Sequence, residues 1–421
     1  MTTVFQKIIS IKLRTLPASA RAHRGAARAL SMLLVIAALH LAAASSALAA
    51  HRNHRERPRE AARKSQSPAK PPYEAACVME PTTGTVIFAR NEHEPWPTAS
   101  LAKMMVMLIV AEKLQNGSLK LTDPITTSRK AAEMGGSQVY LKEGETFPLA
   151  DMMKAIIVHS ANDATVAVAE YIAGSTEAFV QMMNRKAREL GMKDTHYYSV
   201  HGLPPNPGQK ADVSSAYDEA LLARQLVRYP IILKWSAIKT APFRNGTFTL
   251  RNTNHLVFTY NGCDGLKTGF YHQAGFNVVA TAHRAGMRLI AVVLGSPLKR
   301  QNFEQAAVML SEGFASYEMR RVAAKGAAIS REVAIRNGEV ASLKPVFAED
   351  ASVFVKRDDA AKAISVSYQL PPEINAPVVA GQKIGTAEIS LDGKPVSVVA
   401  LVAPRAIAAR KSLLSRLWGH L

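Results

Sequence analysis

The sequence predicts an α+β fold, in which a larger domain with helices flanking an antiparallel sheet is followed by a small all-β domain. Three observations carry this prediction. The apolar run Leu101–Ala111 has the length and composition of a buried helix. Two β-rich runs, 274–282 and 288–295, are separated by a turn at 284–286, which is typical of paired strands. From about residue 322, short alternating runs replace the helical patterns.

Residues 1–49 have the pattern of an export signal. Basic residues precede an apolar run over 29–44, and Ala47-Leu48-Ala49 is a small-residue cleavage site. Ser31 and His40 interrupt the apolar run, which makes it a poor membrane span. We therefore expect a signal peptide cleaved near Ala49, with an uncleaved anchor as the alternative, and an extracytoplasmic mature protein.

Residues 50–72 form a basic, Pro-containing linker that we expect to be disordered. Residues 1–72 hold thirteen Lys and Arg against two Glu and so carry +11 of the net charge of +19. The linker is either a solvated spacer or a segment that rests on anionic lipid or wall polymer. Because most of the excess charge lies outside the folded domains and no nucleic-acid-reading motif accompanies it, we predict no nucleic-acid partner.

The start of the buried helix carries an S-x-x-K pattern, Ser100 to Lys103. The chain has three further matches, which begin at Ser67, Ser236 and Ser296, but only one S-x-N and one K-T-G. The order S-x-x-K, S-x-N, K-T-G leaves Ser67 and Ser100, and the Pro-rich surroundings of Ser67 cannot build a helix. With Thr98 as N-cap, Ser100 and Lys103 would share one helical face, near the positive end of the helix dipole.

The second and third patterns are Ser160-Ala161-Asn162 and Lys267-Thr268-Gly269. Ser160 ends an apolar helix that starts near residue 151, and another helix follows over 164–172. The K-T-G lies on a predicted strand, whose edge suits an extended substrate. The polar interruption at Ser160 is by itself also compatible with a capping loop.

A serine and two lysines suit acyl transfer without a histidine base. Lysine is a poor base at its ordinary pKa of about 10.4, but burial and a second cation both lower that value. Two like charges ~4 Å apart at an effective dielectric of ~20 repel by about 4 kcal/mol, which is enough to neutralise one of them. If the fold brings Lys267 beside Lys103, one of the two can act as a base.

These patterns resemble the low-molecular-weight penicillin-binding proteins of the D-alanyl-D-alanine carboxypeptidase family over about residues 73–318. Supporting phrases include Gly135-Gly136-Ser137, His201-Gly202-Leu203 and Ala274-Gly275-Phe276-Asn277. The resemblance implies a β-lactamase/transpeptidase-like catalytic domain over 73–320 and a C-terminal β domain over 321–404. It also implies a serine peptidase that removes the terminal D-alanine of peptidoglycan stem pentapeptides in the periplasm and is inhibited by β-lactams.

The resemblance assigns a role to each site residue. Ser100 would be the nucleophile, Lys103 its base, Ser160 the proton relay and Asn162 the group that holds the substrate amide. The residues that would bind the substrate are Lys267, Thr268, Gly269 and Phe270, the last with its backbone N–H as an oxyanion donor. The sequence departs from the commoner family pattern at Phe270-Tyr271-His272, where small or hydroxylated residues are usual, so pocket width and substrate preference are open.

Alternative functions share the same patterns. A D,D-endopeptidase would cut cross-links, and a β-lactamase would need a deacylating glutamate, for which Glu219 in a helical stretch is a poor match. A non-catalytic wall-binding protein would not need all three patterns complete. We predict no cofactor and no metal site, and Cys77 and Cys263 either pair or stay free.

The tail 405–421 has an amphipathic pattern, with Ile407, Leu414 and Trp418 on one helical face. At this length it would lie on a membrane surface and not cross it. A terminal helix packed on the β domain is the alternative. The tail of the related carboxypeptidases favours the membrane surface.

Overall fold

The computed structural model describes residues 71–359 and 363–410. The predicted signal peptide, nearly all of the predicted linker with Ser67, and the tail from residue 411 lie outside the described residues. In the described ranges no helix is long and apolar enough to span a membrane.

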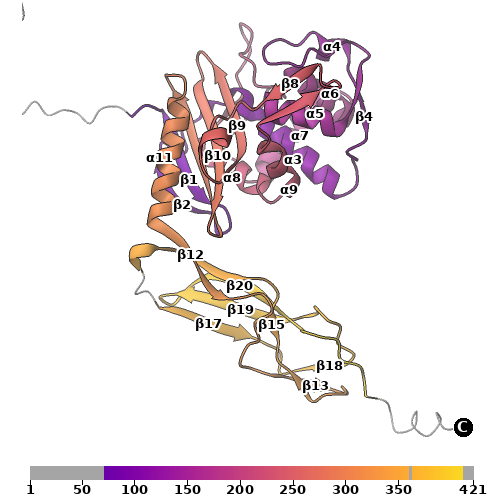
Figure 1. The fold of residues 1–421 in the computed structure, drawn as a ribbon, viewed down its shortest axis with the longest axis vertical. Helices are drawn as coiled ribbons and strands as arrows, with labels where there is room; N and C mark the ends of the chain where they lie inside the picture. Colours follow the sequence, from indigo (N-terminus) through magenta and orange to yellow (C-terminus); the bar gives the residue numbers. More distant parts are fainter. Residues whose placement is uncertain (1–70, 360–362, 411–421) are drawn as a thin grey trace, which may run out of the picture. The chain divides into compact units, whose positions relative to one another are not determined.

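A five-stranded antiparallel sheet forms the centre of the first domain (Figure 1). In spatial order its strands are β2 (Thr85–Arg90), β1 (Ala75–Glu80), β11 (Met287–Ser296), β10 (Gly275–Arg284) and β9 (Cys263–Tyr271). The hairpin β10–β11 turns at Ala285 and Gly286, as the sequence predicts. β9, which carries the K-T-G, is an edge strand, so no further strand of the sheet pairs with its outer side.

Both faces of this sheet are buried, and side-chain alternation explains why. On β11, Ile290 and Val292 belong to one hydrophobic cluster, whereas Leu289 and Ala291 belong to another. The second cluster is closed by α11 (Gln301–Ser316), which Figure 1 shows along one side of the sheet. Strands covered on both faces read as continuous apolar runs, which is the pattern of β11.

The first cluster lies between the sheet and a group of helices on its other face. At its centre is α3 (Lys103–Gln115), which is buried all round from Lys103 to Ala111 and is therefore a core helix. The other helices of this group are α4 (Arg129–Ala132), α5 (Leu149–Lys154), α6 (Asn162–Ala173), α7 (Thr176–Glu189), α8 (Ala216–Leu226) and α9 (Pro230–Ser236). The short α10 (Leu256–Thr259) contributes Leu256 to the second cluster. Short strand pairs are β3 (Trp96–Pro97) with β6 (Val213–Ser214), β4 (Pro124–Thr126) with β5 (Thr146–Pro148), and β7 (Thr240–Phe243) with β8 (Phe248–Arg251).

The second domain is built of β-strands with two hydrophobic clusters. One sheet has the order β15 (Val346–Phe347), β20 (Lys394–Val402), β19 (Lys383–Leu391), β17 (Ile364–Gln369). The others are β12 (Tyr317–Ala323) with β16 (Ala351–Lys356), and β14 (Ser342–Leu343), β13 (Val333–Arg336), β18 (Glu373–Asn375). The predicted hairpin turns at Asp392 and Gly393, both with positive φ, which suits a two-residue connection. The α+β fold class followed by an all-β domain is confirmed.

The chain after β20 differs from the expectation for the tail. Residues 403–410 form no helix, and Ile407 pairs with Val378 and is buried in the β domain. We expected Ile407 on the apolar face of a tail helix. Instead, its backbone pairs with that of Val378, and its side chain is part of a hydrophobic cluster of the β domain.

Candidate active site

Ser100 and Lys103 lie at the junction of two helical elements. A 3-10 turn, Ala99–Ala102, leads into α3, and the Lys103 Nζ donates to Ser100 Oγ at 3.0 Å. The same amine donates to the carbonyl oxygen of His201 at 2.6 Å, and the lysine is fully buried. The i,i+3 spacing therefore places the amine on the hydroxyl, as predicted. Thr98 does not cap with its side chain, because its hydroxyl donates to carbonyl oxygens.

Two glycines allow other segments to approach this turn. Gly202 has φ +74°, and a Cβ there would lie 1.9 Å from the Ala99 carbonyl oxygen. A Cβ on Gly269 would lie 2.5 Å from the Thr98 carbonyl oxygen and 3.1 Å from the backbone nitrogen of Ser100. The third residue of the K-T-G is therefore a glycine because β9 passes against the backbone of the nucleophile.

Lys267 connects the third pattern to the second. Its Nζ donates to Ser160 Oγ at 2.8 Å and to the Thr268 carbonyl oxygen at 3.0 Å. Ser160 follows α5 and a π-helical turn, Ala155–His159, and has the left-handed backbone φ 65°, ψ 29°. That conformation is uncommon for a residue other than glycine and is found at functional sites.

Burial changes the acid–base properties of both lysines. It lowers the pKa of Lys267 to about 7. The pKa of Lys103 is held well below its ordinary value by burial first and by the charge of Lys267 second. Asp212 and Asp163 act in the opposite direction. A neutral amine within hydrogen-bond distance of Ser100 Oγ can accept the proton of that hydroxyl.

Asn162 begins α6 and connects this helix to the segment that contains Gly135 and Ser137. Its Nδ2 donates to the Gly135 carbonyl oxygen at 2.7 Å, and its backbone N–H donates to the Ser137 carbonyl oxygen at 2.7 Å. The Asn162 Oδ1 is buried without a hydrogen-bond partner within the described chain. Ser137 Oγ donates to the His159 carbonyl oxygen at 2.6 Å. The two segments therefore hold one another through backbone and side-chain contacts.

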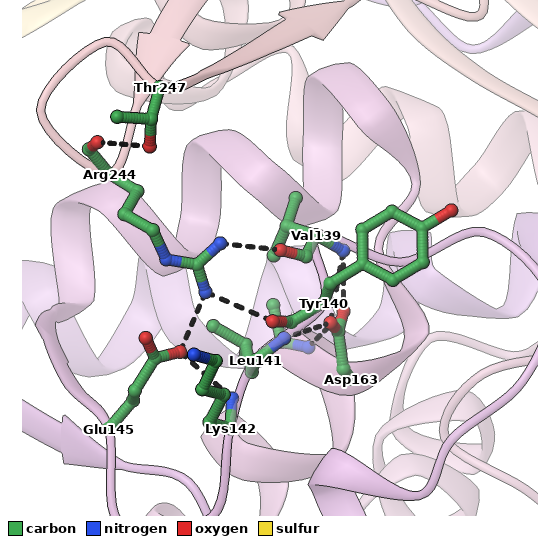
Figure 2. Close-up of polar contacts among 9 residues, drawn as sticks. Val139, Tyr140, Leu141, Lys142, Glu145, Asp163, Arg244 and Thr247 are labelled. Atoms are coloured by element: carbon green, nitrogen blue, oxygen red, sulfur yellow. Dashed lines mark hydrogen bonds and ion pairs between the residues drawn. The ribbon is translucent and has the colours of Figure 1, made fainter.

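The segment after Ser137 forms hydrogen bonds with side chains on two sides, Asp163 on one and Arg244 on the other (Figure 2). The Asp163 carboxylate accepts from the backbone N–H groups of Val139 and Leu141. Arg244, from the loop between β7 and β8, donates to the carbonyl oxygens of Val139 at 3.2 Å and Tyr140 at 3.0 Å. It also pairs with Glu145 at 2.6 Å.

A cavity of about 440 Å³ joins these parts. Ser100, Ser137 and Ser160 line it. The remaining lining residues are Arg251, Thr253, His255, Thr268, Gly269, Phe270, Phe276, Asn277, Lys299, Arg300, Asn302 and Phe303. Thr268 donates its hydroxyl to Thr253 Oγ1 at 2.8 Å. Phe270 is 56% exposed.

The eight residues predicted from the sequence thus gather around one site. Five of them line the cavity, Lys103 and Lys267 each bond to one of its serines, and Asn162 lies two residues after Ser160. Sequence reasoning missed Arg244, Asp163, Thr253 and Asp212 as parts of the site. No spacing signals Arg244, which is more than one hundred residues from its carbonyl partners.

The two cysteines are free thiols. Cys77 lies on β1 and Cys263 on β9, and β11 and β10 separate these strands. Cys77 and Cys263 are therefore separated by three interstrand spacings of about 4.8 Å each, and their sum exceeds the Cα separation that a disulfide spans. Among the described residues no cluster of His, Cys, Asp and Glu could hold a metal ion.

Comparison with known proteins gives consistent matches. Residues 62–297 match the family model described as D-alanyl-D-alanine carboxypeptidase, and residues 317–409 match that of the penicillin-binding protein 5 C-terminal domain. The chain is 34% identical over 342 residues to the D-alanyl-D-alanine carboxypeptidase DacF of Bacillus subtilis, covering 80% of this chain and 85% of that protein.

Two solved structures are similar as well. Penicillin-binding protein 5 of Haemophilus influenzae has a TM-score of 0.63 and 30% identity, over 81% of this chain and 99% of that one. Penicillin-binding protein D2 of Listeria monocytogenes, in its ampicillin-bound form, has a TM-score of 0.53 and 29% identity, over 58% of this chain and 99% of that one.

Proposed function

The chain belongs to the D-alanyl-D-alanine carboxypeptidase family, and from this premise we propose that it removes the terminal D-alanine from peptidoglycan stem pentapeptides through an acyl-enzyme on Ser100. The observation that carries the proposal is the buried Lys103 amine, 3.0 Å from Ser100 Oγ, with its pKa well below the ordinary value. A hydroxyl next to a neutral amine is an activated nucleophile.

The proposed reaction has two steps. In the first, Lys103 accepts the hydroxyl proton while Ser100 Oγ attacks the carbonyl carbon of the penultimate D-alanine. The oxyanion is held by the backbone N–H groups of Ser100 and Phe270. The C–N bond then breaks, and the leaving amine takes a proton through Ser160. In the second step, water adds to the ester, releases the tetrapeptide as a carboxylic acid and restores Ser100.

The substrate would be held from both sides. The Asn162 side chain would bind the peptide amide, and its unpartnered buried Oδ1 supports that role. Lys267 and Thr268 would hold the terminal carboxylate, since Lys267 carries charge below its pKa of about 7 and Thr268 faces the cavity. β-Lactams would acylate Ser100 as substrate mimics, in line with the ampicillin-bound form of the related protein D2.

We also infer an exported protein whose site works outside the cytoplasm. The supporting evidence is the signal pattern over 1–49 and the family to which the chain belongs. Residues 411–421 are the part of the amphipathic tail left to lie on a membrane, since Ile407 belongs to the β domain. Mass analysis of the mature N-terminus tests cleavage near Ala49. Fractionation of cells with and without residues 411–421 tests the attachment.

The activity is tested by mass spectrometry of the purified protein with a stem pentapeptide. We expect the loss of one alanine, abolished in Ser100→Ala and kept in the matched control Ser67→Ala, which alters the other ordered S-x-x-K match. Cleavage of a cross-linked peptide dimer instead of the pentapeptide would indicate the endopeptidase. Rapid turnover of penicillin without peptide cleavage would indicate a β-lactamase.

A further inference from the structure

The cavity beside Ser100 has an aromatic wall. Phe270 on β9 and Phe276 on β10 are directly opposite each other, and their rings stack with centroids 4.1 Å apart. Phe303 of α11 lines the same space. Phe270 remains 56% exposed although a stacking partner covers one side of it. An exposed ring with a stacking partner on one side is suited to contact an apolar ligand on the other.

The position of this wall relative to Thr268 indicates which part of a substrate meets it. Side chains two residues apart on a strand point to the same face, so Thr268 and Phe270 face the cavity together. Under the proposed function Thr268 holds the terminal carboxylate. The aromatic wall therefore borders the terminal residue, which is the one that leaves.

The charges around the cavity agree with a carboxylate-bearing occupant. Arg251, Lys299 and Arg300 line it, and the lining residues identified in the described chain include neither Asp nor Glu. The Arg251 guanidinium lies 5.0 Å from the Phe258 ring centroid, which helps to fix its position. The surroundings thus favour an anion attached to an apolar group.

The aromatic surface beside Thr268 exceeds what a terminal alanine needs, because the rings of Phe270, Phe276 and Phe303 all line the cavity there. About 440 Å³ lies within the range of roughly 300–1,000 Å³ that is usual for sites binding drug-sized molecules. A methyl group has too little apolar surface to cover two stacked rings. A terminal D-alanine would therefore leave most of this aromatic surface uncovered.

We propose that the leaving-residue side of this site accepts large apolar D-amino acids, so that the enzyme also releases residues such as D-leucine or D-phenylalanine from stem peptides. This inference rests on the proposed function and uses the same reaction. Ser100 Oγ bonds to the same carbonyl carbon, the C–N bond to the terminal residue breaks, and the amine leaves as the free D-amino acid. Water then hydrolyses the ester.

The test compares three tripeptides, diacetyl-L-Lys-D-Ala followed by D-Ala, D-Leu or D-Phe, with the full-length protein. Release of the terminal residue is measured by mass spectrometry, and kcat/KM is determined for each peptide. The variants are Phe270→Ala, Phe270→Leu and Phe276→Leu. Tyr171→Ala is the matched control, because Tyr171 is an exposed aromatic residue of α6 outside the cavity.

We expect the wild type to cleave the D-Phe peptide with a kcat/KM at least equal to that for D-Ala. Phe270→Ala should lower the D-Phe to D-Ala ratio by about tenfold, mainly through KM, because a ring–ring contact is lost. Phe270→Leu should lower it less, and Tyr171→Ala should leave it unchanged. The ratio compares two peptides on one protein, so partial loss of folded enzyme cancels from it.

Two results would overturn the inference and leave the proposed function intact. One is cleavage of the D-Ala peptide with rejection of D-Leu and D-Phe. The other is a ratio that does not change in Phe270→Ala and Phe276→Leu. Failure to release D-Ala from any peptide would overturn the proposed function itself and this inference with it.

Discussion

Gly269→Ala should disable the site through a displacement that follows from the structure. The added Cβ would lie 2.5 Å from the Thr98 carbonyl oxygen, 0.9 Å short of the 3.4 Å at which ordinary contact begins. The Thr98 oxygen is a backbone atom and cannot rotate away, so β9 must move away from the turn that carries Ser100. The proposed oxyanion donors, the N–H groups of Ser100 and Phe270, lie on the two sides of this contact and would separate. A misplacement of about 1 Å costs roughly 10²-fold in rate.

The assay is the rate of acylation by a fluorescent penicillin under single-turnover conditions. We expect about a 10²-fold decrease for Gly269→Ala, while the thermal unfolding transition stays cooperative. Gly117→Ala is the control, since Gly117 has φ +78° and a Cβ added there would meet nothing within 4 Å. That change should cost about 1 kcal/mol of stability and leave acylation intact. Acylation of Gly269→Ala within threefold of the wild-type rate would show that this close approach does not position the oxyanion donors.

Three further predictions concern charge and packing. The acylation rate at saturating penicillin, where weaker binding to an uncharged Lys267 has no effect, should rise with pH and level off below pH 10.4, the ordinary lysine value, because Lys103 must be neutral to act. A rate that climbs beyond that value would contradict a buried base. The free energy of unfolding should increase between pH 7 and 10.5, by at most about 1.4 kcal/mol per unit from Lys267, because the unfolded lysine binds a proton that the folded one does not. Urea unfolding of Lys267→Met should show a smaller slope than the wild type, with Lys103 supplying the remainder, and an unchanged slope would contradict the lowered pKa of Lys267. Arg244→Ala should cost about 2–3 kcal/mol of stability and slow acylation, since a charged donor to three acceptors is removed. Arg129→Ala, which breaks an exposed pair, should cost under about 0.5 kcal/mol. Equal effects of the two changes on unfolding and acylation would show that Arg244 does not hold the segment after Ser137 in place.

The spacing of residues along the sequence predicted those contacts of the site that lie within a single helix or hairpin. The Ser100–Lys103 contact follows from an i,i+3 relation, and the burial of Lys103 follows from its apolar neighbours. The paired strands around residue 285 and the hairpin at Asp392 were predictable for the same reason, since a turn and its flanking alternation are contiguous. The roles of the site residues stay predictions until they are measured.

Contacts between distant segments were not predictable. Arg244 reaches the carbonyl oxygens of Val139 and Tyr140 only because the β7–β8 loop folds over that segment. The left-handed backbone of Ser160 comes from the end of a π-helical turn, for which residue types give no signal. Ile407 fitted an amphipathic helix, but backbone pairing with Val378 decided its conformation instead. In each case tertiary contacts outweighed the local pattern.

The proposed mechanism requires that Ser100 carries the acyl group, and peptide mapping after reaction with penicillin tests this directly. We predict one penicilloyl adduct, on the proteolytic fragment that contains Ser100, and no adduct in Ser100→Ala. An adduct on a fragment containing Ser67, Ser160 or Ser296, or undiminished labelling of Ser100→Ala, would contradict the mechanism.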